Sequence, residues 1–234
     1  MDDRVARILV ELNHAFYDRF AFEFSETRTN PQPGFQRLIT LISEYQSPQV
    51  LDVGCGNGRF GLFLAASGIQ AHYVGVDFSE GLAATTHPFP GILTARDLSV
   101  AGCLEGLALF DIIVCLSTLQ HIPSHENRLR LMVEMREQLK EDGRLVIANW
   151  QFMSSERQKQ KIVPWEVIGL SADQVEPNDY LLTWQRGGMG LRYVANLNLE
   201  YIQEIASKAG FSVVETYYSD GREGNLNLYT IMAG

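Results

Sequence analysis

The chain has 234 residues, of which 46% are hydrophobic and 20% charged, an ordinary composition that is sufficient for one globular domain with a sizeable core. Its net charge of −9 at pH 7 argues against bulk binding of DNA or of an anionic membrane by charge alone. The cysteines (Cys55, Cys103 and Cys115) form no CxxC pair, no apolar run approaches the roughly 18–20 residues that span a bilayer, and the acidic start is unlike a signal peptide, so we expect a cytoplasmic protein without disulfides, a metal site or a membrane span.

The first 47 residues are predicted to form a helical cover. Apolar side chains at helical spacing predict a leading helix over residues 4–21 and a second one over about 35–45. Between them, residues 25–34 are rich in Pro, Thr and Asn, and we expect this segment to be irregular.

Residues 48–150 alternate between short apolar runs and helical patterns. The runs QVLDV, HYVGV, GILTA, DIIVC and RLVIANW predict five strands, and helices are expected over 59–66, 79–84 and 125–139. In the last helix, Leu129, Met132, Val133 and Leu139 are predicted to share one face, with Gly143 beyond its end. This alternation predicts a parallel sheet, because parallel neighbours need a crossover helix.

Beyond Trp150 the pattern changes. A polar helix over 153–162 and a hairpin, YLLTWQR and LRYVANL around the turn GGMG, predict a substrate-side insertion over residues 151–197. Residues 198–234 then contain a helix over 199–209 and two strands, FSVVETYY and LNLYTIM. The chain is therefore predicted to be a single α/β domain with a doubly wound, mostly parallel seven-stranded sheet, N-terminal helices and a C-terminal hairpin cap.

The sequence LDVGCGNGRF, which directly follows the first predicted strand, indicates a ligand site. Gly54, Gly56 and Gly58 allow a tight turn and a close approach of a ligand, at the strand ends where open α/β sheets bind small molecules. The loop reads GxGxG, not the GxGxxG of dinucleotide sites, and Asp52 precedes it. A carboxylate at that place suits a cationic ligand better than a pyrophosphate.

Two further acids follow predicted strands. Asp77 ends the second strand, where a carboxylate binds the two hydroxyls of a ribose; the alternative is a turn or helix-capping residue. Asp97 follows the third strand and suits an adenine amino group, with Leu98 packing on the ring; the alternative is a solvated loop residue.

Together these residues resemble the class I S-adenosylmethionine-dependent methyltransferases, which carry a (D/E)xGxGxG loop, an acid after the second strand and an Asp after the third. The resemblance covers about residues 48–150 and implies a Rossmann-like methyltransferase fold with S-adenosyl-L-methionine as cofactor. The further cofactor contacts that it implies are Cys55, Phe78, Leu98, Leu116, Ser117 and Thr118.

The stretch FDIIVCLSTLQHIP resembles the segment of that family that meets the substrate. It implies that Gln120 and His121 lie on the substrate side, with His121 as the candidate general base. The alternative is a structural histidine. Related sequences often have two adjacent histidines here, whereas this chain has Gln120 at the first of the two positions, which counts against a catalytic role of His121.

The two ends resemble the tRNA wobble-uridine carboxymethyl methyltransferases. Residues 16–35, FYDRFAFEFSETRTNPQPGF, resemble the N-terminal signature, which implies that Tyr17 and Arg28 line the cofactor pocket and that Arg28 holds the methionine carboxylate. The segments LRYVANL and GREGNLNLY resemble the "RYYH" and "GNW" stretches, except that Ala195 and Leu226 replace His and Trp. A tethering loop is the alternative for the N-terminal segment.

The resemblance implies tRNA as the methyl acceptor, with a small zinc-containing activator protein as a possible partner. A small metabolite stays an alternative acceptor, since residues 151–234 hold seven Lys/Arg against ten Asp/Glu. A nicotinamide-dependent oxidoreductase and a non-catalytic cofactor-binding module are weaker alternatives. A carboxylate acceptor needs no base, whereas a hydroxyl or an amine needs one. The candidate substrate-binding residues beyond Gln120 and His121 are Trp184, Arg186, Arg192, Tyr193 and Arg222.

Overall fold

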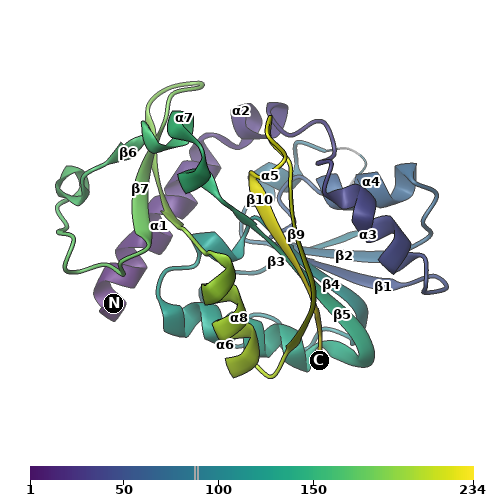
Figure 1. The fold of residues 1–234 in the computed structure, drawn as a ribbon. Helices are drawn as coiled ribbons and strands as arrows, with labels where there is room; N and C mark the ends of the chain where they lie inside the picture. Colours follow the sequence, from purple (N-terminus) through teal and green to yellow (C-terminus); the bar gives the residue numbers. More distant parts are fainter. Residues whose placement is uncertain (87, 89) are drawn as a thin grey trace.

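A seven-stranded sheet forms the centre of the computed structural model, which describes residues 1–86, 88 and 90–234 (Figure 1). The strand order is β3-β2-β1-β4-β5-β10-β9. The first five strands in this order are parallel, and β10 runs antiparallel to both β5 and β9. The predicted mostly parallel sheet is confirmed. Its strands are β1 (Gln49–Val53), β2 (His72–Asp77), β3 (Ile92–Ala95), β4 (Phe110–Leu116), β5 (Leu139–Trp150), β9 (Ser212–Ser219) and β10 (Asn227–Ala233).

Helices cover both faces of this sheet. Side chains of α3 and α4, such as Leu38 and Leu64, pack with Val50 and Val114 of the strands on one face. Side chains of α6 and α8 pack with alternate strand residues such as Leu51 on the other, as the twofold alternation of strand side chains requires. The helices are α1 (Asp3–Arg19), α2 (Ala21–Glu26), α3 (Phe35–Ile42), α4 (Arg59–Ala66), α5 (Glu80–Ala83), α6 (His125–Glu137), α7 (Glu156–Lys159) and α8 (Leu199–Lys208), with 3-10 turns η1 (Leu119–His121), η2 (Phe152–Ser154) and η3 (Trp165–Ile168).

The insertion forms a second, smaller antiparallel sheet. Its strands β6 (Ile162–Val163), β7 (Asp179–Trp184) and β8 (Gly190–Ala195) are ordered β6-β7-β8. The predicted hairpin is therefore present, and β6 extends it by a third strand. Figure 1 shows α1 beside this small sheet, and Asn13 of α1 is hydrogen-bonded to Tyr193 of β8.

Several predicted helices differ in detail. The leading helix is divided at Phe20, which stands between α1 and α2. The polar helix expected over 153–162 is reduced to η2 and the single turn of α7. In α6, Val133 is 37% exposed while Leu131 and Met135 are buried, so the predicted apolar face was misaligned. Leu139 and Gly143 already belong to β5.

A buried hydrogen-bond network ties the N-terminal cover to the last hairpin. Asp220 accepts from the Gly34 N–H at 2.8 Å, from Asn227 Nδ2 at 2.7 Å and from the Tyr229 hydroxyl at 2.6 Å. The network holds the segment between α2 and α3 against the sheet. Among the described residues, no helix combines the length and the apolar character needed to cross a membrane, and no group of three His, Cys, Asp or Glu side chains is arranged to hold a metal.

Candidate active site

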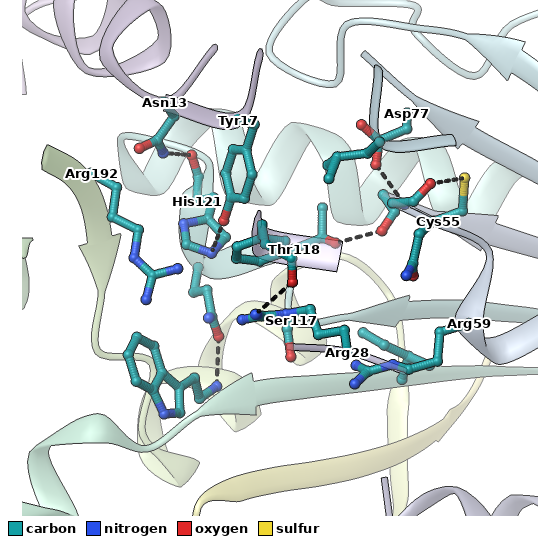
Figure 2. Close-up of a pocket in the computed structure, with 18 of the residues that line it drawn as sticks. Asn13, Tyr17, Arg28, Cys55, Arg59, Asp77, Ser117, Thr118, His121 and Arg192 are labelled. Carbon is teal, nitrogen blue, oxygen red and sulfur yellow. Dashed lines mark hydrogen bonds between the residues drawn. The ribbon is translucent and has the colours of Figure 1, made fainter. Parts of the chain in front are cut away.

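A cavity of about 450 Å³ lies where the parallel strands end and the cover folds over them. Figure 2 shows Asp77 and Cys55 on one side and Arg192 on the other, with Tyr17, Thr118 and His121 between them. We call Asp52, Gly54, Gly56, Asp77 and Asp97 the acidic end, and Gln120, Trp150, Lys161, Trp184 and Arg192 the basic end. The predicted residues that line the cavity are Tyr17, Arg28, Asp52, Gly54, Cys55, Gly56, Asp77, Phe78, Asp97, Leu98, Leu116, Ser117, Thr118, Gln120, His121, Trp184 and Arg192.

The glycine loop forms the floor of the acidic end. Gly54 has φ +77°, and a Cβ at this position would lie 2.2 Å from Thr118 Oγ1, so only glycine fits. Gly56 has φ +54°, and a Cβ there would meet nothing within 4 Å, which leaves its backbone open to a ligand. Gly58 precedes α4 and does not line the cavity, so its predicted cofactor contact is not supported.

Asp52 is buried beneath this loop. The Tyr73 hydroxyl donates to its Oδ2 at 2.5 Å, while Oδ1 has no hydrogen-bond partner among the described residues. Burial raises the pKa of Asp52 to about 7, partly offset by the bond from Tyr73. A buried carboxylate oxygen without a hydrogen-bond partner is costly, and positive charge nearby stabilises it. Arg59 is one such charge, since it acts to lower the pKa of Asp52.

The other two acids each make local hydrogen bonds. Asp77 accepts from the N–H groups of Gly56 at 2.8 Å and Ser79 at 2.9 Å, so it fixes the loop as well as lining the cavity. Asp97 accepts from the Ser99 N–H at 2.9 Å and hydroxyl at 2.6 Å, and its side chain is 38% exposed. Asp77 therefore combines the predicted cavity position with its turn alternative, and Asp97 combines it with its alternative as a partly solvated loop residue.

His121 lies in the middle of the cavity wall in a neutral form. Its Nδ1 is 3.0 Å from the Tyr193 carbonyl oxygen, and its Nε2 is 3.1 Å from the Tyr17 hydroxyl. Burial, with smaller contributions from Arg192 and Arg28, lowers the pKa of His121 to about 3. With both ring nitrogens engaged and a low pKa, His121 is poorly suited to be the predicted general base.

Asn13 of α1 is a site residue that the sequence analysis missed. Its Nδ2 donates to the carbonyl oxygens of His121 and Tyr193, both at 3.2 Å, and its Oδ1 accepts from the Tyr193 N–H at 2.8 Å. These partners lie 108 and 180 residues away in the chain. An asparagine within a helical pattern carries no signal of such distant partners.

Arg28, which follows α2 in the N-terminal cover, lines the cavity. Its guanidinium is 3.4 Å from the ring centre of Phe24 and donates to Thr27 Oγ1 at 2.5 Å. Burial and then repulsion from Arg192 lower the pKa of Arg28 to about 9. No carboxylate of the described residues lies within 4.0 Å of it, so this guanidinium can take an anionic group of a ligand.

The basic end is formed around Arg192 of β8. Only 4% of Arg192 is exposed, and its Nε has no hydrogen-bond partner in the described part of the chain. Its guanidinium lies 5.1 Å from the ring centre of Trp150 and 5.8 Å from that of Trp184. Burial, followed by repulsion from Arg192, lowers the pKa of Lys161. Neither cation forms an ion pair with a described residue.

Gln120 and Trp184 are held at the cavity wall by hydrogen bonds to the backbone. The side-chain oxygen of the buried Gln120 accepts from the Trp150 N–H, and the Trp184 indole donates to the Arg186 carbonyl oxygen, both at 2.5 Å. The Gln120 oxygen and the Trp184 N–H are thereby engaged, whereas the Gln120 amide nitrogen forms no hydrogen bond with a described residue. Lys161 and Trp150 belong to this wall but were not predicted.

Three predicted substrate residues lie outside the cavity. Tyr193 follows Arg192 on β8 and so points to the opposite face, where its hydroxyl donates to Asp179 at 2.7 Å. Arg186 forms a surface ion pair with Glu26 at 3.1 Å. Arg222 is exposed in the turn between β9 and β10. These three residues therefore do not line the cavity as the other predicted site residues do.

Comparison with known proteins agrees with this geometry. The family model described as "Methyltransferase domain" matches residues 17–216. The "Putative methyltransferase" of Encephalitozoon cuniculi is 30% identical over 210 residues, which cover 86% of this chain and 88% of that protein. The "Probable tRNA methyltransferase 9B" of Bos taurus is 26% identical over 174 residues, covering 70% of this chain and 35% of that protein, so this chain spans about a third of that relative's length.

The fold also has solved counterparts. The crystal structure of a S-adenosylmethionine-dependent methyltransferase from Clostridium acetobutylicum superposes with a TM-score of 0.64 and 12% sequence identity, covering 94% of this chain and 96% of that one. At this identity the likeness concerns the fold. Taken with the family model that covers most of the chain, it leads to one conclusion: this chain belongs to the methyltransferase-domain family.

Proposed function

We propose that the chain transfers the methyl group of S-adenosylmethionine to a carboxylate, with the carboxymethyl group of a tRNA wobble uridine as the leading acceptor. The observation that carries this proposal is the charge asymmetry of the cavity. Buried acids line one end, and a buried guanidinium without an anionic partner lies at the other. A cationic methyl donor and an anionic acceptor complement these two ends.

The acidic end fits the cofactor. Asp52 places a buried carboxylate beside the loop, where its negative charge favours a cation. Gly56 leaves its backbone uncovered, and Asp77 stands at the strand end where a ribose binds. When bound, S-adenosylmethionine supplies a methyl group on a positively charged sulfur. Arg28, which has no carboxylate partner, is suited to the methionine carboxylate of the same molecule.

The basic end fits an anionic acceptor. Burying a charged group without a partner costs several kcal/mol, and an acceptor carboxylate next to Arg192 would remove this cost. A carboxylate is also nucleophilic at neutral pH without deprotonation. This agrees with His121, which is neutral and hydrogen-bonded through both nitrogens. The chain would then act by positioning the reactants and excluding water.

Two acceptor classes share this chemistry. The N-terminal and C-terminal resemblances and the tRNA methyltransferase relative support tRNA. The net charge of −9, with seven Lys/Arg against ten Asp/Glu in residues 151–234, favours a small carboxylic acid instead. A small partner protein would supply the basic surface that tRNA binding requires.

The test is methyl transfer to fractionated cell extracts. Purified protein and isotopically labelled S-adenosylmethionine are incubated with RNA and with small molecules from cells that lack the protein. Label in tRNA, recovered on digestion as the methyl ester of a carboxymethyl uridine, supports the leading acceptor. Label in small acids supports the second acceptor, and label in neither fraction contradicts the proposal.

A further inference from the structure

The side-chain amide of Gln120 is held in one orientation. The Trp150 backbone N–H donates to its oxygen Oε1 at 2.5 Å, and an N–H group needs an oxygen, not an amide nitrogen, as its partner. The bond therefore directs the amide nitrogen Nε2 away from the Trp150 N–H. Gln120 is 1% exposed and lines the cavity, and Nε2 forms no hydrogen bond with a described residue. The N–H donors of this amide are thus left for a ligand.

Trp150 also contacts Arg192, so the two donors share a neighbour. The Arg192 guanidinium lies 5.1 Å from the ring centre of Trp150. It also interacts with the Tyr17 hydroxyl, but a guanidinium has five N–H donors, and Nε of Arg192 has no partner in the described part of the chain. Figure 2 shows Arg192 beside His121, which is the neighbour of Gln120 in the chain.

The side chains of the basic end offer donors, not acceptors, to a ligand. Lys161 lines the same wall and forms no ion pair with a described residue. Gln158 also lines the cavity, but its oxygen Oε1 is enclosed by the protein. A ligand group with N–H hydrogens would therefore meet donors with donors, whereas both oxygens of a carboxylate accept.

We infer that Gln120 is a specificity-determining residue, whose fixed amide donates to one oxygen of the acceptor carboxylate while Arg192 donates to the other. The inference rests on the proposed transfer to a carboxylate and names the residue that selects it. Arg192 supplies the charge, and Gln120 supplies a directed donor that does not titrate. The bond from Trp150 prevents the amide from turning to offer its oxygen instead, so a group that cannot accept leaves buried donors unpaired.

Two variants separate this role from a structural one. Gln120→Glu keeps an oxygen for the Trp150 N–H but replaces the amide nitrogen by a negatively charged oxygen, which repels an acceptor carboxylate. Gln120→Met keeps the length of the side chain and loses both interactions. If Gln120 only supported the Trp150 backbone, Gln120→Met would be the more harmful change. If Gln120 binds the acceptor, Gln120→Glu is the more harmful.

The experiment measures the acceptor KM in methyl transfer from labelled S-adenosylmethionine to the cell fraction that the wild type labels. We expect Gln120→Glu to raise this KM at least about 30-fold and Gln120→Met about tenfold. The KM of S-adenosylmethionine should stay within about threefold of the wild type in both. Thermal unfolding of Gln120→Glu should match the wild type, whereas Gln120→Met should unfold at a lower temperature because the Trp150 N–H loses its partner.

Three results would overturn the inference. They are an acceptor KM of Gln120→Glu within about threefold of the wild type, a larger increase in Gln120→Met than in Gln120→Glu, and an acceptor KM of Gln120→Met within about twofold of the wild type. The last result decides the question alone if Gln120→Glu does not fold. A wild type that labels no fraction would instead contradict the proposed function, and the inference with it.

Discussion

The two ends of the cavity differ in charge and in how the chain builds them. The acidic end comes from the glycine loop after β1 and from the tips of the neighbouring strands β2 and β3. The basic end combines side chains from η1, β5, β7 and β8 with Lys161, which directly precedes β6. The acidic end therefore belongs to the sheet, whereas the basic end combines the sheet region with the insertion that covers it. Under the proposed function, we expect the acidic end to hold the methyl donor and the basic end to select the acceptor.

The largest expected effect is at the acidic end. Asp77→Ala removes a carboxylate that also accepts from the Gly56 and Ser79 N–H groups. We expect affinity for S-adenosylmethionine to fall at least about 100-fold, equivalent to about 2.7 kcal/mol, as measured by calorimetry. Asp77→Asn keeps the shape and one acceptor, so it should lose less. Affinity of Asp77→Ala within threefold of the wild type would contradict this assignment.

The next prediction concerns the basic end. Arg192→Met keeps an apolar stem between the rings of Trp150 and Trp184 but removes the cation. Cofactor affinity should stay within about twofold, while the initial rate of methyl transfer falls about 100-fold because a charge-assisted contact is lost. The exposed Arg222 provides the matched control, and Arg222→Ala should transfer methyl groups at the wild-type rate. Equal losses of methyl-transfer rate in the two variants would contradict a specific role of Arg192 in acceptor binding.

Affinity for S-adenosylmethionine is expected to change about tenfold with pH, through ionisation of Asp52 at the acidic end. The pKa of Asp52 is raised to about 7, so the ionised fraction rises from about 3% at pH 5.5 to about half at pH 7. Since a cation prefers the ionised form, affinity for S-adenosylmethionine should rise roughly tenfold over this interval. Calorimetry at both pH values measures it. Asp52→Asn, which cannot ionise, should bind equally at both, and a persistent slope in that variant would assign the titration to another group.

The smallest effect on activity is expected for Tyr193→Phe. The Tyr193 hydroxyl donates to Asp179 at 2.7 Å and accepts from Arg128 at 3.0 Å, away from the cavity. Its loss should reduce the free energy of unfolding by about 1–3 kcal/mol, as measured by denaturant titration, with methyl transfer unaffected below the midpoint. A changed acceptor KM at unchanged stability would return Tyr193 to the substrate site.

Much of the fold was predictable because the periodic patterns are local. The helix 59–66 and the strand 49–53 agree with α4 and β1 residue for residue. The errors arise where tertiary packing decides. The helical pattern of the first residues does not indicate the break at Phe20, and β6, with two residues, is too short to give a pattern. In α6, the predicted apolar face included Val133, whose side chain is exposed in the packed structure.

The acidic end was predictable and the basic end was only partly so. Asp52, Gly54 and Gly56 form one motif, and Asp77 and Asp97 follow strands that end at the same edge. In contrast, Lys161 and Trp150 come together with Arg192 only through the pairing of the small sheet and its place over β5. One register position on β8 separates Arg192 in the cavity from Tyr193 in the core, and the sequence pattern does not indicate which of the two faces the site.

The chemical nature of the methylated product tests most directly whether the acceptor is a carboxylate. The protein is incubated with labelled S-adenosylmethionine and its acceptor fraction, and the labelled product is treated with mild alkali. A methyl ester of a carboxylate hydrolyses under these conditions, so we expect the label to be released as methanol. Label that stays bound to the product would show methylation of nitrogen, carbon or a hydroxyl group, and would contradict an anionic acceptor held by Arg192.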